Sequence, residues 1–380
     1  MFSFSRENKS LIASRFRNID KTILFFILLL FLLGIFFSFS STSSVVADKL
    51  NKESYFFLKK HTVFVFLGFL IIFFIFLAEE KFIKKYLPII FIFSFLLLLL
   101  VPFIGTEVKG SKRWLDLFLL PRFQPIEIVK PFFVIICAQI ISSKIEYSIY
   151  KKHLLSFLIL SSILFLLILQ PDLGQSVLLF SSWLIMVYSS GFNLIFLIIF
   201  LIICLFCLFS VIFLFPEKFG YIILRLKSFI DPTKGDNYQS EKALEAIVSG
   251  GFTGRGLGEG VLKDLVPEAH TDYIIAVISE EYGALLILFL IIIFLLLSYK
   301  VLYKLQNEKD DYIKLVLVGL VSLLLVQTFI HIGVNIRLFP TTGMTLPFLS
   351  YGGSSIIGTA IISGLILNFT KNKPNLNNNL

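Results

Sequence analysis

Residues 265–299 read LVPEAHTDYIIAVISEEYGALLILFLIIIFLLLSY. The second half of this stretch is almost entirely leucine, isoleucine and phenylalanine, and a helix needs roughly 20 such residues to cross the hydrocarbon core of a membrane. The first half carries Asp272, Glu280 and Glu281. Ionisable residues within a membrane span are costly and usually face the protein interior or a watery cavity. The stretch therefore predicts a transmembrane helix with a polar, functional end.

The composition of the whole chain extends this prediction. Of the 380 residues, 57% are hydrophobic, 45 are phenylalanine, and the mean hydropathy is +0.90. A soluble domain needs a charged surface and does not sustain such values. The net charge is +9, but the charges separate apolar runs instead of forming one stripe, which favours anionic lipid headgroups over nucleic acid as their partner. We expect an integral membrane protein that binds no nucleic acid.

Apolar runs long enough to span a membrane recur along the chain and predict an all-α polytopic fold with about ten transmembrane helices. We expect a tail at 1–21, a transmembrane domain at 22–370 with a long loop at 216–272 between the seventh and eighth spans, and a polar tail at 371–380. The expected spans lie near 22–40, 62–79, 86–104, 125–142, 153–170, 174–190, 192–215, 273–300, 311–335 and 350–370.

Lysine and arginine are more frequent in the short segments on the side of the N-terminus than in the alternate loops. Cytoplasmic loops carry this excess, so we expect both termini in the cytoplasm. The loops at 105–124, 216–272 and 336–349 would then lie outside the membrane.

Four polar clusters interrupt the apolar pattern and fall on this outer side. Irregular backbone at membrane depth is tolerated only where it is buried in protein or lines a watery cavity. The clusters therefore predict one shared cavity that opens outward. They are KGSKRWLDLFLLPRFQPIEIVK at 109–130, LQPDLGQS at 169–176, the glycine-rich stretch at 225–260, and NIRLFPTTGMTLPFLSYGGSS at 335–355.

Each cluster also has a purely structural explanation. Arg113 and Trp114 are typical of an interfacial anchor, Asp172 of a tight turn, and the glycines at 250–260 of a flexible loop. Asp272 stands where a helix cap is expected. Glu127 and Lys130 are harder to explain in this way, because they lie three residues apart on one face of a predicted span.

The first, second and fourth of these clusters, together with the opening stretch, resemble the SEDS family (shape, elongation, division and sporulation), whose members include FtsW, RodA and SpoVE. The resemblance covers residues from about 20 to 370 and rests on several long motifs in the same order. They are Arg113-Trp114, Gln124-Pro125-Ile126-Glu127 with Lys130, Gln170-Pro171-Asp172 with Gly174, Pro267-Glu268 with Thr271-Asp272-Tyr273-Ile274, and Pro340, Gly343, Leu346-Pro347 and Ser350-Tyr351-Gly352-Gly353-Ser354-Ser355.

Two residues depart from the family pattern. Ile126 replaces a usual serine, and Tyr273 replaces a common phenylalanine. Neither change affects the residues on which the functional prediction depends. The stretch at 339–347 resembles the division branch of the family more than the elongation branch.

The resemblance implies a glycosyltransferase of the bacterial inner membrane that polymerises lipid II, the undecaprenyl-diphosphate-linked precursor, into peptidoglycan during septal wall synthesis. It implies a class B penicillin-binding protein as partner, which we expect along the spans at 273–300 and 311–335, and other membrane proteins of the division complex. An elongation polymerase, a lipid II flippase without catalysis, and a scaffold for the crosslinking enzyme are the alternatives.

The family's essential aspartate corresponds to Asp272, which we expect to be the catalytic base. Because a diphosphate leaving group needs charge compensation, Arg113, Lys130 and Arg225 are expected to bind it. The other predicted substrate-binding residues are Glu127, Asp172, Glu268, Thr271, Glu280, Glu281, Ser350 and Ser354.

No cofactor is required by the residue inventory, because the four histidines and three cysteines show no ligand spacing. A divalent cation, Mg²⁺ or Mn²⁺, held by Asp172 or Asp272 together with diphosphate oxygens is compatible with this inventory, since hard cations favour carboxylate and phosphate.

Overall fold

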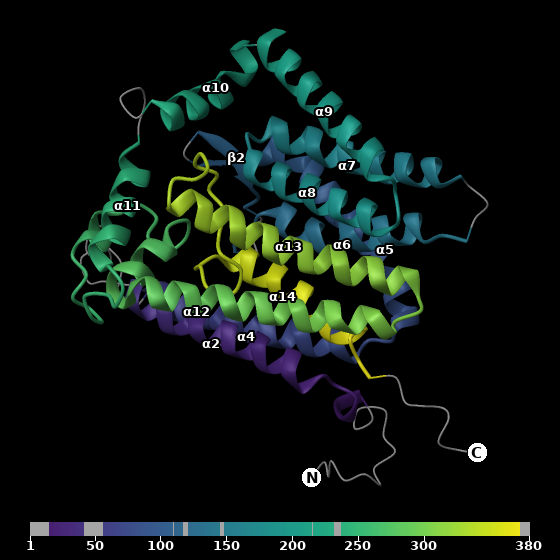
Figure 1. The fold of residues 1–380 in the computed structure, drawn as a ribbon, viewed down its shortest axis with the longest axis horizontal. Helices are drawn as coiled ribbons and strands as arrows, with labels where there is room; N and C mark the ends of the chain where they lie inside the picture. The colour runs from purple at the N-terminus through teal and green to yellow at the C-terminus, as the bar shows by residue number, and fades with distance from the viewer. Residues whose placement is uncertain are drawn as a thin grey trace.

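The computed structural model describes residues 15–41, 56–108, 110–116, 121–144, 148–214, 216–231 and 237–372. Within these ranges, a helix lies at each of the ten positions where a span was predicted (Figure 1). They are α2 (Lys21–Ser41), α4 (Phe56–Leu77), α5 (Glu80–Ile104), α6 (Pro125–Ile141), α7 (Ile149–Leu169), α8 (Leu173–Ser189), α9 (Leu194–Leu214), α12 (Ile274–Lys304), α13 (Asp311–Asn335) and α14 (Gly353–Phe369). Of the expected tails at 1–21 and 371–380, residues 1–14 and 373–380 lie outside the described residues.

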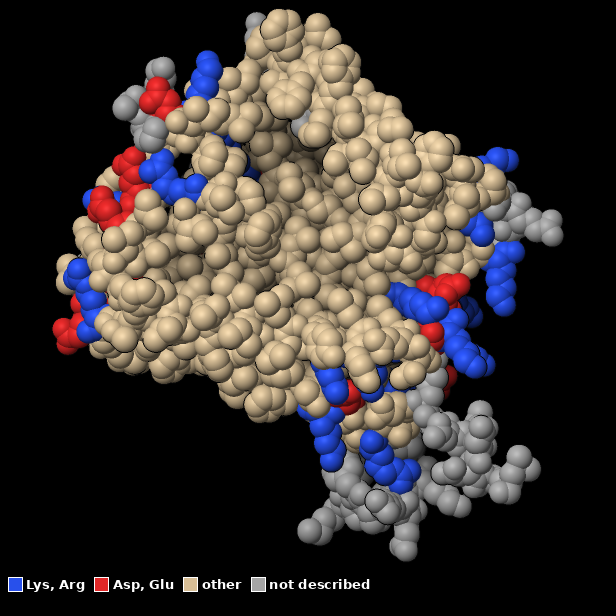
Figure 2. Space-filling view, in the orientation of Figure 1, with Lys and Arg blue, Asp and Glu red and all other residues tan. Residues whose placement is uncertain are grey.

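Seven of these helices are long and apolar enough to cross a membrane. The exceptions are α6, α8 and α14, each of 17 residues. Figure 2 shows one face of the molecule as a broad uncharged surface, with the charged side chains gathered towards its two ends. This distribution is the one expected of a protein whose middle band faces lipid.

The last helix, α14, forms the centre of the bundle and is buried along nearly its whole length. It packs against α4 and α6, while α13 packs against α8 and α6. Small residues allow the close approach to α4, since a Cβ built on Gly68 would lie 3.3 Å from the Cβ of Ala360 and one built on Gly364 3.2 Å from the Cα of Ile72. Small residues are enriched at such contacts in membranes because they let helix backbones approach each other.

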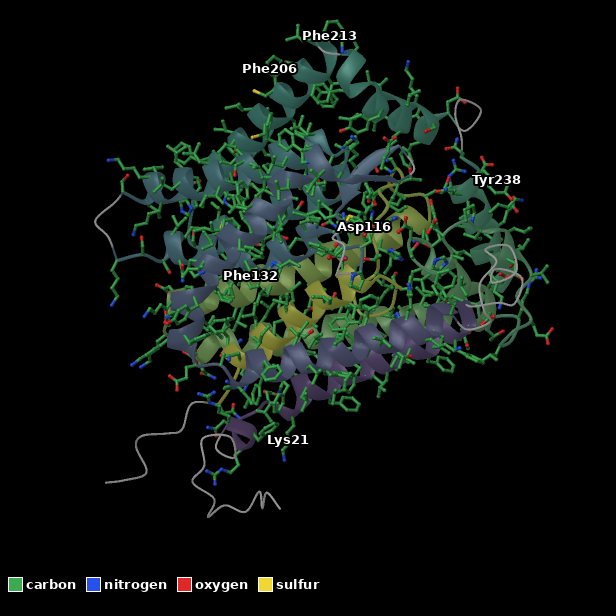
Figure 3. The ribbon with its side chains drawn as sticks, turned by 180° about the vertical axis from the view of Figure 1, so that it is seen from behind. Lys21, Asp116, Phe132, Phe206, Phe213 and Tyr238 are labelled. Atoms are coloured by element: carbon green, nitrogen blue, oxygen red, sulfur yellow. The ribbon has the colours of Figure 1, made fainter. Side chains whose placement is uncertain are left out.

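In contrast to the buried helix α14, α9 has little contact with the other helices. Figure 1 shows α9 and the following helix α10 (Pro216–Ile230) projecting from the other helices. Phe206 and Phe213 point outward from α9 (Figure 3) and are 72% and 86% exposed. These rings are suited to lipid contact.

The outer loop at 216–272 is more ordered than the sequence indicated. It contains α10, the helix α11 (Tyr238–Gly250) and a 3₁₀ turn, η1 (Leu262–Leu265). The first predicted cluster forms a hairpin of β1 (Thr106–Val108) and β2 (Ser111–Trp114). Both features lie on the side where the predicted clusters gather.

The prediction of one continuous helix at 273–300 was wrong. α12 is broken at Gly283, where φ is 81° and ψ is 175°. The backbone of the glycine-rich loop inserts at this point, so that Ala284 N–H bonds to the carbonyl of Gly251 at 2.9 Å and Arg255 N–H to that of Glu280 at 2.9 Å. A helix break at membrane depth requires such partners for the freed backbone groups. The span therefore begins with a separate short helix at 274–282.

Candidate active site

Residues of all four predicted clusters line one open cavity of about 550 Å³, to which the stretch at 225–260 contributes Arg225 and Gln239 and none of its glycines. β2 and the start of α6 form one wall, and residues 341–345 and 351–353 form another. The turn that precedes α12 completes it. The cavity lining includes Arg113, Trp114, Gln124, Glu127, Gln175, Arg225, Glu268, Thr271, Asp272, Gly343 and Tyr351.

Asp272 and Arg113 face the same point of this cavity. A Cβ built on Gly343 would lie 3.5 Å from Nη1 of Arg113 and 3.6 Å from Oδ2 of Asp272. Gly343 has a φ of 70°, a conformation that favours glycine. The absence of a side chain at 343 leaves the space between the carboxylate and the guanidinium open to a substrate.

A tight turn places Asp272 at the cavity. The carbonyl of Glu268, whose φ is 56°, accepts hydrogen bonds from the backbone N–H groups of Thr271 at 3.0 Å and Asp272 at 3.1 Å. Asn335 of α13 donates from Nδ2 to the carbonyl of Asp272 at 3.0 Å. The N-cap of α12 is Tyr273, so Asp272 lies before the cap position. Hydrogen bonds to both the N–H and the carbonyl group of Asp272 thus fix the position of this residue at the cavity.

Ser350 and Ser354 support this geometry from behind the cavity wall. The Ser350 hydroxyl donates to the carbonyl of Thr271 at 2.6 Å, and the Ser354 hydroxyl accepts from the N–H of Gln124 at 2.9 Å. They are 1% and 5% exposed. Both hydroxyls are used within the protein, and the contact of these two serines with substrate stays a prediction.

Asp172 has a similar supporting position. Its carboxylate pairs with Nε of Arg113 at 3.7 Å, accepts from Nε2 of Gln124 at 3.1 Å and caps α8 by accepting from the N–H of Gln175 at 3.4 Å. Burial raises the pKa of the Asp172 carboxyl, and the Arg113 cation opposes this rise. Asp172 is 1% exposed and orients Arg113 from the buried side, and its contact with substrate stays a prediction.

Glu127 and Lys130 form an ion pair beneath the cavity. Nζ of Lys130 lies 2.8 Å from Oε2 of Glu127 and donates to Oε1 of Gln327 at 3.1 Å. Gln175 donates from Nε2 to Oε1 of Glu127 at 2.8 Å. Lys130 is 1% exposed and lies outside the cavity lining. Glu127 lines the cavity floor, whereas Lys130 lies beneath it, and direct contact of Lys130 with a diphosphate stays a prediction.

The remaining predicted residues divide between the cavity and a second region. Arg225 of α10 lines the cavity and donates to the carbonyl of Thr341 at 3.3 Å. Glu268 and Thr271 line it as well, with Oγ1 of Thr271 donating to Oε2 of Glu268 at 3.0 Å. Glu280 and Glu281 are buried against the glycine-rich loop, outside the cavity lining, and their contact with substrate stays a prediction.

Sequence reasoning missed Gln175, Gln327 and Asn335. The latter two are buried amides inside the span at 311–335. Polar residues within an apolar span usually face the bundle interior, and this signal was available. The side chain of Gln327 connects the Glu127–Lys130 ion pair to α13, and the side chain of Asn335 connects the backbone of Asp272 to the same helix.

The described residues contain no group of three or more His, Cys, Asp or Glu side chains that could hold a metal ion. Asp172 does not fit the predicted cation site, because its oxygens are engaged in the protein interior. The carboxylates of Glu268 and Asp272 both line the cavity, and together with phosphate oxygens they match the preference of Mg²⁺ and Mn²⁺ for oxygen ligands.

Comparisons with known proteins agree with this architecture. Residues 20–375 match the family model of the cell cycle proteins FtsW, RodA and SpoVE. The probable peptidoglycan glycosyltransferase FtsW of Caulobacter vibrioides is 30% identical over 373 residues, which cover 98% of this chain and 94% of that protein. The probable peptidoglycan glycosyltransferase FtsW of Haemophilus influenzae is 31% identical, with coverage of 92% and 89%.

Two solved structures share the fold. The first, described as "Structural coordination of polymerization and crosslinking by a peptidoglycan synthase complex", has a TM-score of 0.75 at 24% identity and covers 93% of this chain and 97% of that chain. The rod shape determining protein RodA of Thermus thermophilus has a TM-score of 0.67 at 24% identity, with coverage of 93% and 96%.

The buried ion pair predicts a specific pattern of stability. Lys130→Met should lower the free energy of unfolding by about 3–5 kcal/mol, because it leaves the Glu127 carboxylate buried without a cation. The double variant Glu127→Gln/Lys130→Met should recover most of this loss, since no uncompensated charge then remains. Unfolding of the detergent-solubilised variants measures both effects. Equal destabilisation of the single and double variants would contradict a buried ion pair between Glu127 and Lys130.

Proposed function

The chain belongs to the FtsW/RodA/SpoVE family of cell cycle proteins, and on that premise we propose that Asp272 is the catalytic base of its glycosyl transfer. The chain is a peptidoglycan glycosyltransferase that polymerises lipid II, and the FtsW names of its relatives support a role in septal wall synthesis over one in elongation. The observation that carries the proposal for Asp272 is its carboxylate facing the Arg113 guanidinium across Gly343.

The reaction needs two different groups at one place. The acceptor hydroxyl of the sugar is a weak nucleophile until a positioned base takes its proton, a contribution of roughly 10²–10⁴-fold. In our proposal the acceptor oxygen forms a bond to the anomeric carbon of the donor, the bond from that carbon to the diphosphate breaks, and the proton passes to Asp272. The lipid diphosphate leaves with the bonding electrons.

Arg113 and Arg225 are suited to the departing diphosphate. Both guanidinium groups line the cavity, and a planar guanidinium binds phosphate oxygens in a bidentate manner. Asp172 holds Arg113 from the buried side. Lys130 lies one layer deeper, where its ion pair with Glu127 supports the floor of the cavity.

A bound Mg²⁺ or Mn²⁺ would be held by Asp272 and Glu268 and would neutralise charge on the diphosphate. This proposal rests on the two carboxylates that line the cavity. Polymerisation that continues at the full rate in excess chelator would contradict it.

A flippase or a scaffold would use the same fold without chemistry. Neither requires a carboxylate and a guanidinium to face one substrate-sized space, and this pairing supports catalysis. Formation of glycan polymer by the purified protein, with no other polymerase present, separates the enzyme from both alternatives.

The partner that we propose is a class B penicillin-binding protein, as the structure named for a peptidoglycan synthase complex suggests. An apolar groove between α11, α12 and α13 supports docking of a membrane helix there, and its lining includes Ile247, Ile275, Ile287, Ile332 and Ile336. Other membrane proteins of the division complex would join this pair at the septum. Both termini of the chain would lie in the cytoplasm of the cell, as the charge distribution indicates.

Arg113→Ala should reduce lipid II polymerisation by the purified protein at least about 100-fold, because a preorganised cation at developing charge contributes on this scale. The protein should still insert into the membrane. Lys112→Ala is the matched control, since Lys112 is the exposed neighbour on β2 and lies outside the cavity lining; it should retain activity. Equal activity of the Arg113→Ala and Lys112→Ala proteins would remove Arg113 from the site.

A cysteine at Ile287 should crosslink to a cysteine in the membrane helix of the partner, because Ile287 lines the proposed groove. Leu32→Cys on α2 provides the control, because Leu32 is 59% exposed and lies outside the groove lining. Crosslinks that form at position 32 and not at 287 would place the partner elsewhere. The yield is read by gel shift after oxidation.

A further inference from the structure

A second cluster of buried charges lies outside the cavity, where the glycine-rich loop meets α12. Glu280 and Glu281 are 0% and 1% exposed. They lie about two turns after Asp272, at the end of the short helix 274–282 that precedes the break at Gly283. The proposed chemistry does not use either carboxylate, yet a buried carboxylate is costly unless it is paired and hydrogen-bonded.

The carboxylate of Glu280 binds three consecutive backbone N–H groups. Oε1 accepts from Val261 and Leu262 at 2.9 Å each, and Oε2 accepts from Lys263 at 2.6 Å. Successive N–H groups that converge in this way form an anion-binding concavity. Here the anion is the Glu280 carboxylate, which attaches the segment 261–263 to the short helix at 274–282.

Glu281 extends this attachment to α2. Its carboxylate accepts from the N–H of Gly258 at 3.2 Å and pairs with the Lys263 ammonium. It also accepts from the Ser40 hydroxyl, which lies 2.6 Å from the Tyr282 hydroxyl. The short helix, the glycine-rich loop and the outer end of α2 are therefore joined by one buried network.

This network and Asp272 are connected through the chain on both sides. Before Asp272, the segment bound by Glu280 continues into η1 and then into the turn from Pro267 to Asp272. After Asp272, the short helix leads back to Glu280. The break at Gly283 separates this unit from the rest of α12. A shift of the segment 261–263 would thus move the turn that carries Asp272.

We propose that Glu280 is a positioning residue for Asp272, which it holds at the cavity through the three N–H groups of residues 261–263. This inference rests on the proposed catalytic role of Asp272. Glu280 does not touch the substrate, so its loss should affect the chemical step and leave substrate binding by Arg113 and Arg225 largely unchanged.

Glu280→Gln tests the inference with little change in side-chain volume. In the glutamine side chain, an NH2 group replaces one of the two acceptor oxygens. This donor then faces a backbone N–H group, which weakens the attachment of residues 261–263. Polymerisation should show a kcat lowered roughly 10–100-fold, because small displacements of a catalytic group have effects of this size. KM for lipid II should stay within about twofold and the amount of inserted protein should be normal. Glu259→Gln is the matched control, an exposed glutamate of the same loop.

Hydrogen exchange provides a readout that does not depend on activity. Amides in peptides covering 258–273 should exchange faster in the Glu280→Gln protein than in the wild-type and Glu259→Gln proteins. Faster exchange that stops before residue 267, or a wild-type kcat, would overturn the inference. A parallel loss of kcat, rise of KM and loss of protein would also overturn it, since that pattern indicates a purely structural role.

The same experiments separate this inference from the proposed function. If Asp272→Asn polymerises normally, the catalytic assignment fails, and the exchange measurement alone decides whether Glu280 holds the segment 267–273. If Asp272→Asn is inactive while Glu280→Gln is fully active with unchanged exchange, the proposed function stands and the positioning role of Glu280 is wrong.

Discussion

A polar group at membrane depth has no water to bind and must find its partners within the protein. This constraint organises the outer half of the molecule. Glu127 is paired with Lys130, Asp172 with Arg113, and Glu281 with Lys263, while Glu280 uses backbone N–H groups. The Asp172–Arg113 and Glu281–Lys263 pairs also fix two elements in relation to each other, whereas Glu127 and Lys130 both belong to α6. The charges that the opening stretch carries into an apolar helix are therefore the means by which the loops around the cavity are held.

The same constraint explains how much of the fold was predictable. A span must be long and apolar, so all ten helices could be located from the sequence, including the separation of α8 and α9 near Tyr188–Phe192. The break of α12 at Gly283 could not be located. It depends on the backbone of residues 251–256, which lie close in space only after folding, and a single glycine in an apolar run carries no signal of such an insertion.

For the site, motif order and the resemblance identified the clusters that meet at the cavity, and Arg113, Glu127, Arg225, Glu268, Thr271 and Asp272 all line it. The depth of each side chain was not predictable. Lys130 follows Glu127 by one helical turn, and that turn takes it below the cavity floor. Ser350 and Asp172 occur in motifs beside residues that line the cavity, but their side chains point to the backbone and to Arg113. A motif shows which residues gather, whereas packing decides which of them reach a ligand.

The central claim is that the carboxylate of Asp272 removes the proton of the acceptor hydroxyl. Asp272→Asn preserves the size of the side chain and leaves the backbone hydrogen bonds with Asn335 and Glu268 intact, so it removes the basic carboxylate and keeps the position of the residue. The most direct measurement is the rate of lipid II polymerisation by the purified Asp272→Asn protein with its crosslinking partner. The account predicts a rate at least about 100-fold below that of the wild type. A rate near that of the wild type would show that Asp272 is not the base.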